Sequence, residues 1–470
     1  MKENDLNMTN TLNPKRQRPN VLLLYTDQQR WDTIRYGGNT QIQTPHLDQL
    51  AEIGAYFDHA FVNCPVCMPS RMSMLSGQYP SSVGVCTNGI EMPDDVPCVQ
   101  DVLGLYGYQT ANIGKLHFKN HASPYRDHRE PYPSYGFDTL ILSDEPGCYD
   151  DAYIKWVGDR DPRQVDKCRI DTPPAWTGKP ISVHPRDVIA PYVFDGDESL
   201  THTAFVADQT VEFLRQRKNE PFFCISGFYA PHSPLNPPRR FVEMYDPDQM
   251  TLPHRNQGEN YKDTSEQQWR KAKAYYYALI SHIDDQIGRI LSALDQFGLR
   301  EKTLVIFTSD HGENLGDHGL VGKSQPYDSS ARVPLIVSHP TGFSGSQHYS
   351  EIIEAVDIVP SILDWCGIQV PPYMQGRSFR SLVEGRPYLA RESAFIELRN
   401  PFVHSYKAIR SHDYLYSQNN RGQEQLFDLT VDPHQLYNIT DTTELDPQRG
   451  LMLRKWFEVE KQYPLRTANY

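Results

Sequence analysis

The chain has 470 residues, of which 39% are hydrophobic, so it is long enough to bury a sizeable core. Its 59 acidic residues outnumber the 46 basic ones, and the formal net charge of −13 disfavours nucleic acid or an anionic membrane as the main partner. An anionic substrate would need a site that a metal ion and a few cations make locally positive.

The first 18 residues are polar and lack the apolar core of a signal peptide. We expect them to form a polar tail, or an arm for a neighbouring subunit in a homo-oligomer. No run of 18 apolar residues occurs, so no membrane span is expected. Cys64 and Cys67 form a lone CxxC, which alone would indicate a redox or zinc half-site, but the eight cysteines mostly suit buried free thiols in a reducing compartment. These features predict a cytoplasmic protein.

Short apolar runs that end in polar residues predict buried strands. They span residues 20–26, 222–228, 303–308 and 333–337. Helices are expected between them, at 45–57, 266–297 and 354–366. The alternation predicts a mainly parallel sheet covered by helices on both faces, and ligands of such sheets bind beyond the carboxyl ends of the strands. Asp27 and Asp310 stand at two of those ends.

Residues 120–265 are rich in Pro, Asp and Tyr, and we interpret them as long insertions that shape substrate choice rather than as a separate domain. After about residue 385 the pattern alternates, at 402–410 and 414–417, which predicts a small antiparallel sheet followed by a helix at 443–461. The predicted organisation is therefore a tail (1–18), a catalytic domain (19–385) and a C-terminal subdomain (386–470).

The segment Cys67-Met-Pro-Ser-Arg71 carries the most specific signal in the chain. Pro69 suits a first helical turn, so Cys67 is expected at a helix N-terminus, where free N–H groups favour negative charge. A cysteine there could act directly as a thiolate nucleophile. The segment, continued by Leu75-Ser-Gly77, closely resembles the signature of the sulfatase family, in which this cysteine is converted to formylglycine.

The resemblance covers the chain from about Arg18 to Asn438, because further segments match family motifs in the same order. They are residues 20–28, 44–51, 114–117, 230–234, 308–323 and 426–433. The resemblance implies an alkaline-phosphatase-like α/β fold: a mainly parallel central sheet flanked by helices, with a small C-terminal antiparallel-sheet subdomain.

The resemblance also implies a metal site. Asp27, Asp310 and His311 would bind one divalent cation together with residue 67 in its formylglycine form, and Gln28 would be a further neutral oxygen ligand. Oxygen donors with one imidazole suit calcium, which we favour, or manganese or magnesium.

The remaining motif residues would handle the substrate. Arg71 and Lys115 would hold the aldehyde hydrate and neutralise the anion, and His117 would take a proton from it. His232 and Lys323 would bind sulfate oxygens and assist the leaving alcohol.

The predicted function is hydrolysis of a sulfate monoester of a small molecule or saccharide, with a formylglycine-generating enzyme as the maturation partner. The pairs Asp27-Gln28 and Asp310-His311 depart from most sulfatases and resemble choline sulfatases and phosphonate monoester hydrolases. Phosphonate monoester or phosphodiester hydrolysis is therefore the alternative, although the Gly114-Lys115-Leu-His117 motif favours sulfate esters. A third interpretation is a catalytically silent metal- or anion-binding protein that retains a plain Cys67.

Overall fold

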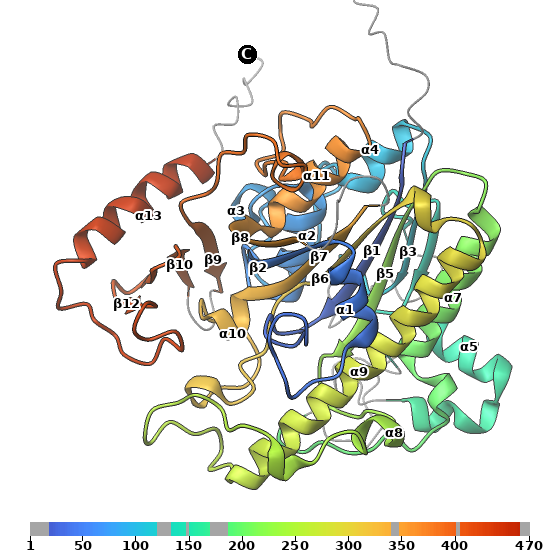
Figure 1. Cartoon of the computed structure of the whole chain (residues 1–470), viewed down its shortest axis with the longest axis horizontal. Helices are drawn as coiled ribbons and strands as arrows, with labels where there is room; N and C mark the ends of the chain where they lie inside the picture. Colours follow the sequence, from blue (N-terminus) through green and yellow to red (C-terminus); the bar gives the residue numbers. More distant parts are fainter. Residues whose placement is uncertain are drawn as a thin grey trace, which may run out of the picture.

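The computed structural model describes residues 18–119, 133–146, 150–169, 187–339, 347–400 and 405–460. Residues 1–17 of the predicted tail lie outside these ranges, and the predicted domain boundaries stay predictions. The described residues form a large mixed sheet between layers of helices and a smaller antiparallel sheet beside it (Figure 1). This arrangement confirms the predicted fold class.

The large sheet has eight strands in the order β4-β3-β5-β1-β6-β7-β2-β8. Their bounds are β1 (Asn20–Asp27), β2 (Ala55–Phe61), β3 (Gln109–Gly114), β4 (Thr139–Leu142), β5 (Phe222–Pro231), β6 (Thr303–Ser309), β7 (Arg332–Ser338) and β8 (Gln347–Glu354). Strands β4 to β6 in this order run parallel, whereas β7 pairs antiparallel with both β6 and β2.

Strand β1 lies in the middle and explains how the sheet is covered on both faces. Leu22 and Leu24 point into a core with α7 (His202–Arg217) and α9 (Glu266–Gln296), while Val21 and Leu23 point into a second core on the opposite face. Because both faces are buried, the strand is a continuous apolar run rather than an alternating one.

Helices on the opposite face of the sheet cover the second core (Figure 1). The larger ones are α2 (Cys67–Ser76), α4 (Val99–Leu105) and α11 (Ile358–Trp365). The shorter or more peripheral helices are α1 (Pro45–Glu52), α3 (Pro80–Val83), α5 (Ala152–Arg160), α8 (Arg239–Val242), α10 (Asp328–Ala331) and α12 (Arg380–Val383).

Two sequence predictions need correction. The helix predicted at 45–57 ends at Glu52, because residues 55–57 pair with β7 and β8 as the start of β2. Residues 120–265 are not only insertions, since β4, α7 and β5 belong to the main sheet and its cover. The apolar face of α7 was obscured by polar residues that face the solvent.

The C-terminal region forms the predicted antiparallel sheet, in the order β12-β11-β10-β9. Its strands are β9 (Ala394–Arg399), β10 (Ser405–Arg410), β11 (Tyr414–Asn419) and β12 (Glu424–Asp428), and α13 (Leu445–Val459) packs on them. Residues 402–404 of the predicted first strand lie outside the described ranges. Arg410 of β10 pairs with the buried Asp328 carboxylate of α10, which ties the small sheet to the large one.

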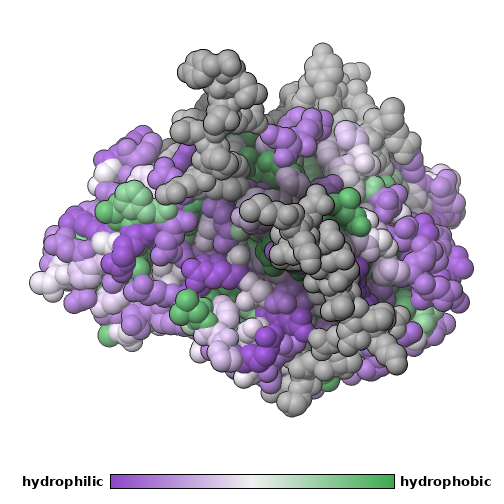
Figure 2. Space-filling model, turned by 90° about the horizontal axis from the view of Figure 1, so that it is seen from above, coloured by the Kyte–Doolittle hydropathy of each residue, from purple (hydrophilic) through white to green (hydrophobic). Residues whose placement is uncertain are grey.

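Figure 2 shows a mostly hydrophilic face with separate hydrophobic residues rather than one broad apolar patch. No helix in the described part of the chain is both long and apolar enough to cross a membrane.

Residue 114, at the end of β3, has to be a glycine because the backbone of β5 comes very close to it. Its φ is +91°, and a Cβ atom there would lie 2.2 Å from the carbonyl oxygen of Gly227 on β5. We expect Gly114→Ala to destabilise the protein by about 2–5 kcal/mol, since left-handed strain and overpacking add. It should also displace Lys115, which follows directly. Denaturant unfolding measures the first effect; a stability within 0.5 kcal/mol of the wild type, as is usual for surface changes, would contradict this interpretation of the turn.

Two buried histidines should make the fold sensitive to acid. Burial lowers the pKa of His202 to about 3 and the pKa of His282 to about 3, so both stay neutral in the folded protein. In the unfolded chain both imidazoles take up a proton below about pH 6.5. Protonation stabilises the unfolded state, so the stability of the protein falls as the pH drops from that value towards 3. Each should cost about 2 kcal/mol at pH 5 relative to pH 8. The slope of the unfolding free energy against pH gives the number of protons taken up on unfolding, and between pH 4 and 6 this number should fall by about one in His282→Gln. An unchanged slope would contradict the inference that His282 is neutral in the folded protein.

Candidate active site and metal centre

The carboxyl ends of β1 and β6 bring the predicted acidic residues together. The strands are parallel neighbours, with Thr26 opposite Ser309, so the residues that follow them meet at one edge of the sheet. The backbone N–H of Gln28 donates to Asp310 Oδ1 at 3.0 Å. Asp27, Asp310 and His311 are all fully buried there.

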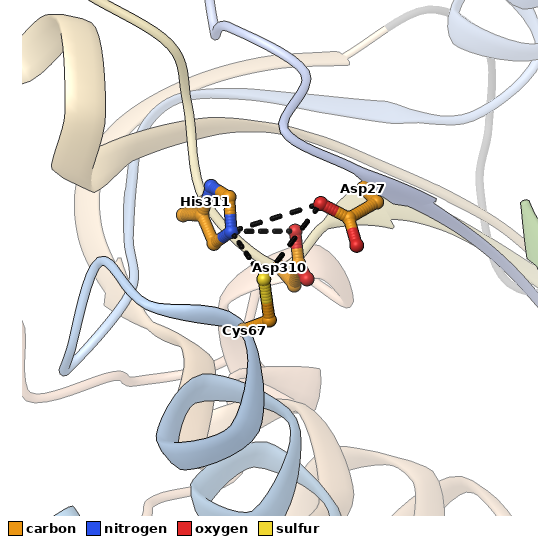
Figure 3. Close-up of side chains that lie close together, drawn as sticks. All are labelled: Asp27, Cys67, Asp310 and His311. Carbon is orange, nitrogen blue, oxygen red and sulfur yellow. Dashed lines mark hydrogen bonds and ion pairs between the residues drawn. The ribbon is translucent and has the colours of Figure 1, made fainter. Parts of the chain in front are cut away.

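Cys67 enters this cluster from the opposite side, as the first residue of α2. Its Sγ atom lies 3.2 Å from His311 Nε2 and 4.0 Å from Asp27 Oδ1. Figure 3 shows these side chains pointing toward one another from separate segments, and one ligand atom from each of Asp27, Cys67, Asp310 and His311 lies within 4.8 Å of the others. The predicted helix N-terminus at position 67 is confirmed.

Two buried cations neutralise the two carboxylates. Arg71, one turn into α2, places Nε 2.8 Å from Asp310 Oδ2 and a terminal nitrogen 3.4 Å from Asp27 Oδ2. Lys115 Nζ lies 2.5 Å from the same Asp27 oxygen. Because a buried charge is costly unless paired, each of these residues depends on the others.

Lys323 approaches the sulfur from the loop after β6. Its Nζ atom lies 3.0 Å from Cys67 Sγ and 2.8 Å from Gln28 Oε1. The amide nitrogen of Gln28 donates to the buried carboxylate of Glu313. Gln28 thus contacts Lys323 through the oxygen that was predicted to bind a metal, and its role as a ligand stays a prediction.

The surroundings of Cys67 favour negative charge at that position. Burial raises the pKa of the Cys67 thiol and Asp27 raises it further, but Lys323, His311 and Lys115 together hold it below its ordinary value. Around the sulfur, three cations (Arg71, Lys115, Lys323) face two carboxylates, so the centre of an acidic protein is locally positive.

His232, in the turn after β5, is a neutral imidazole. Burial lowers its pKa well below the ordinary value and the nearby Lys323 lowers it further, against the opposing effect of Asp27. Its Nδ1 lies 2.9 Å from the carbonyl oxygen of Ser233, so Nδ1–H donates there and Nε2 carries the lone pair.

The main chain around His117 is held firmly. The N–H groups of Leu116 and His117 both donate to Asp144 Oδ1, at 2.7 and 2.9 Å, and His117 has a φ of +61°. The assignment of His117 as a proton acceptor stays a prediction. Positive φ at a non-glycine residue, two positions after Lys115, marks a strained turn of the kind found at functional sites.

Sequence reasoning missed several residues that support this centre. Glu313 accepts from Gln28 and from the N–H groups of Leu315 and Gly322, and burial raises its pKa. The Tyr229 ring lies 4.8 Å from Lys115 Nζ. Glu313 could have been noticed from its place two residues after His311; nothing in the sequence singles out Tyr229.

The donor set fits a divalent cation that prefers oxygen. Two carboxylates and one imidazole nitrogen converge on position 67, which suits calcium, magnesium or manganese better than a structural zinc site. The carboxylates are already aligned by Arg71 and Lys115, so little rearrangement is needed to hold such an ion.

Comparison with known proteins agrees with this geometry. The family model "Sulfatase" matches residues 19–368, and the model "N-sulphoglucosamine sulphohydrolase, C-terminal" matches residues 316–462. An arylsulfatase of Clostridium perfringens is 30% identical over 95% of this chain and 96% of its own length. A choline-sulfatase of Rhizobium meliloti is 28% identical over 90% of this chain and 83% of its own.

A solved structure shares the fold. The phosphonate monoester hydrolase of Agrobacterium radiobacter superposes with a TM-score of 0.80 at 24% identity, covering 94% of this chain and 95% of that one. The motifs that converge on Cys67 are therefore embedded in a fold, and in a sequence relationship, that extend over most of the chain. The chain belongs to the sulfatase family of hydrolases that act on sulfuric esters.

Proposed function

We propose that this chain hydrolyses a sulfate monoester of a small molecule or saccharide, using a formylglycine made from Cys67 and one divalent cation. The observation that carries the proposal is the contact of Cys67 Sγ with both His311 and Lys323, beside buried Asp27 and Asp310. The residue that would become the nucleophile thus lies beside both the side chains that would bind the metal ion and the cations that would bind the sulfate.

Maturation would require a formylglycine-generating enzyme that recognises the segment around Cys67. Residues 67–71 carry the family pattern. An ordinary thiolate at Cys67 is the competing nucleophile, and its lowered pKa means that reactivity alone does not distinguish the two.

Asp27, Asp310 and His311 would hold the cation, with calcium favoured, and Gln28 as a further oxygen donor. When bound, the cation would supply positive charge that acidifies a hydroxyl on residue 67 and withdraws charge from the sulfate.

The chain's own side chains would perform the remaining work. Lys323 would bind a sulfate oxygen, since its Nζ touches Cys67 Sγ, and His232 would bind another after taking up a proton at Nε2. Arg71 and Lys115 hold the carboxylates in place, and Lys115 adds charge against the anion. After sulfuryl transfer, His117 would take the proton of the remaining hydroxyl of residue 67, so that the aldehyde re-forms and the carbon–oxygen bond to the departing sulfate breaks.

Phosphonate monoester or phosphodiester hydrolysis is the second candidate. The neutral Gln28 beside Asp27 distinguishes this centre from one with paired acids, and sulfuryl and phosphoryl transfer place similar charge in the transition state. A relative from Trinickia caryophylli, 27% identical over 96% of this chain, is named a multifunctional alkaline phosphatase superfamily protein.

A substrate panel distinguishes the two functions. Purified protein with formylglycine verified at position 67 is assayed on 4-nitrophenyl sulfate, bis(4-nitrophenyl) phosphate and a phenylphosphonate monoester. We expect the highest kcat/KM on the sulfate, loss of activity in a chelator, and recovery with calcium, manganese or magnesium. Phosphonate or diester turnover far above sulfate turnover would favour the second candidate.

A further inference from the structure

The buried side chain of Glu313 joins two parts of the active centre. It is 1% exposed, and its two oxygens have different partners. Oε1 accepts the backbone N–H groups of Leu315, at 2.9 Å, and of Gly322, at 2.5 Å. Oε2 accepts the side-chain amide of Gln28. All of these partners donate, which suits an ionised carboxylate. One oxygen therefore holds the loop that leads into Lys323, and the other holds a side chain from the end of β1.

The side-chain amide of Gln28 has two possible orientations, and its neighbours decide between them. An ionised carboxylate only accepts, so the amide nitrogen of Gln28 faces Glu313. The Gln28 oxygen then faces the ammonium group of Lys323, which only donates and whose Nζ lies 2.8 Å away. The reversed amide would set its N–H groups against the ammonium and its oxygen against the carboxylate. The acceptor at position 313 thus determines which atom of Gln28 Lys323 meets.

The main chain of Gln28 is held by other residues. Its N–H group donates to Asp310 Oδ1 at 3.0 Å, and its carbonyl oxygen accepts the hydroxyl of Tyr276 at 2.5 Å. Its φ is +68°, in the left-handed region. Because these contacts do not involve Glu313, a change at position 313 should reverse the side-chain amide without altering the course of the chain.

We propose that Glu313 is a positioning residue of the sulfate site: it orients the amide of Gln28, and through that amide it holds the Lys323 ammonium against residue 67. Lys323 Nζ lies 3.0 Å from Cys67 Sγ, so the amide acts on the group that would bind sulfate. Position 28 accordingly carries an amide where most sulfatases have a second acid, because a carboxylate there would face the buried carboxylate of Glu313. This inference rests on the proposed function for the sulfate, but it can be tested without turnover.

Exchanging the two side chains tests this role. Glu313→Gln can keep an oxygen on the N–H groups of Leu315 and Gly322 while it turns an amide nitrogen towards Gln28. It therefore reverses one contact and spares the loop. Gln28→Glu sets two carboxylates against each other. In the double variant a carboxylate at position 28 again meets an amide at position 313, its second oxygen can accept from Lys323, and the formal charge equals that of the wild type.

Affinity for inorganic sulfate is measured by isothermal titration calorimetry in buffer with calcium, and stability is measured by denaturant unfolding. We expect sulfate to bind about tenfold more weakly in Glu313→Gln, because Lys323 loses the hydrogen bond that holds it in place. Charge alone predicts the opposite, since this variant removes an anion near the site. Gln28→Glu should bind sulfate more weakly still. The double variant should bind sulfate more tightly, and unfold at higher denaturant, than either single variant.

Glu397→Gln is the matched control, because Glu397 is also 1% exposed but pairs with Lys407 in the small sheet. It should lower stability and leave the affinity for sulfate unchanged. An affinity in Glu313→Gln equal to or tighter than that of the wild type, or a double variant no better than the single variants, would overturn the inference.

The stability measurement decides the case in which the single variants do not fold. A folded double variant would then support the inference, and an unfolded one would overturn it. Failure of the proposed function gives a different result: the wild type would hydrolyse no sulfate ester, while sulfate affinity and stability would still fall in the single variants and recover in the double variant.

Discussion

Cys67→Ala is expected to reduce sulfate-ester hydrolysis by about 10⁴-fold or more, because it removes the group that forms the covalent bond to sulfur. The fold should persist, since Cys67 makes its contacts with polar side chains at the start of α2 rather than with the hydrophobic core. Steady-state kinetics on 4-nitrophenyl sulfate, with thermal unfolding as a check on folding, measure both effects.

To interpret the kinetics of Cys67→Ala, the chemical state of residue 67 in the wild type must be known. Peptide mass spectrometry of an active preparation should show a peptide about 18 Da lighter than the unmodified sequence, because a thiol-bearing carbon has become an aldehyde. Cys64, three residues earlier and also fully buried, is the internal control and should retain its mass. Full activity in preparations that contain only unmodified Cys67 would contradict the formylglycine assignment and favour a thiolate nucleophile.

Arg71→Met should have the largest effect on stability, about 3–5 kcal/mol, because it leaves buried carboxylates short of a counter-charge. Arg71 is 1% exposed and contacts both Asp310 and Asp27, and its guanidinium lies 4.6 Å from the Tyr25 ring. Methionine keeps much of the length and apolar contact but none of the charge. Denaturant unfolding in the presence of a chelator isolates this effect from metal binding.

Arg289→Met is the control for Arg71→Met. Arg289 pairs with Asp208 at the surface, where both side chains are accessible, so its loss should cost less than about 1 kcal/mol. Equal losses of stability in Arg71→Met and Arg289→Met would mean that the charges of the active centre are not coupled as described.

Calcium should stabilise the wild type, because an ion that binds only the folded chain shifts the unfolding equilibrium.

The sequence was sufficient to predict the parts of the fold that carry strong local patterns. The apolar run before Asp27 predicted the central strand, and the pattern from Cys67 to Arg71 predicted the helix that begins there; both are confirmed. Because the carboxyl ends of neighbouring parallel strands lie at one edge of the sheet, the sequence also led us to expect that Asp27 and Asp310 would converge.

Other parts depend on contacts between distant segments and left no local signal. The predicted helix at 45–57 includes the first three residues of β2, since this short apolar run is compatible with either structure until its pairing with β7 is known. Gln28 and Glu313 contact one another only because their loops fold together across the strand ends.

The most direct test is a crystal structure of the matured protein loaded with manganese, with anomalous difference maps to locate the ion. One anomalous peak should lie among the side chains of Asp27, Asp310 and His311, with bonds of about 2–2.6 Å and an oxygen of residue 67 in the same shell. An ion bound elsewhere in an active preparation, with these three side chains still paired only to Arg71, Lys115 and Cys67, would contradict the account.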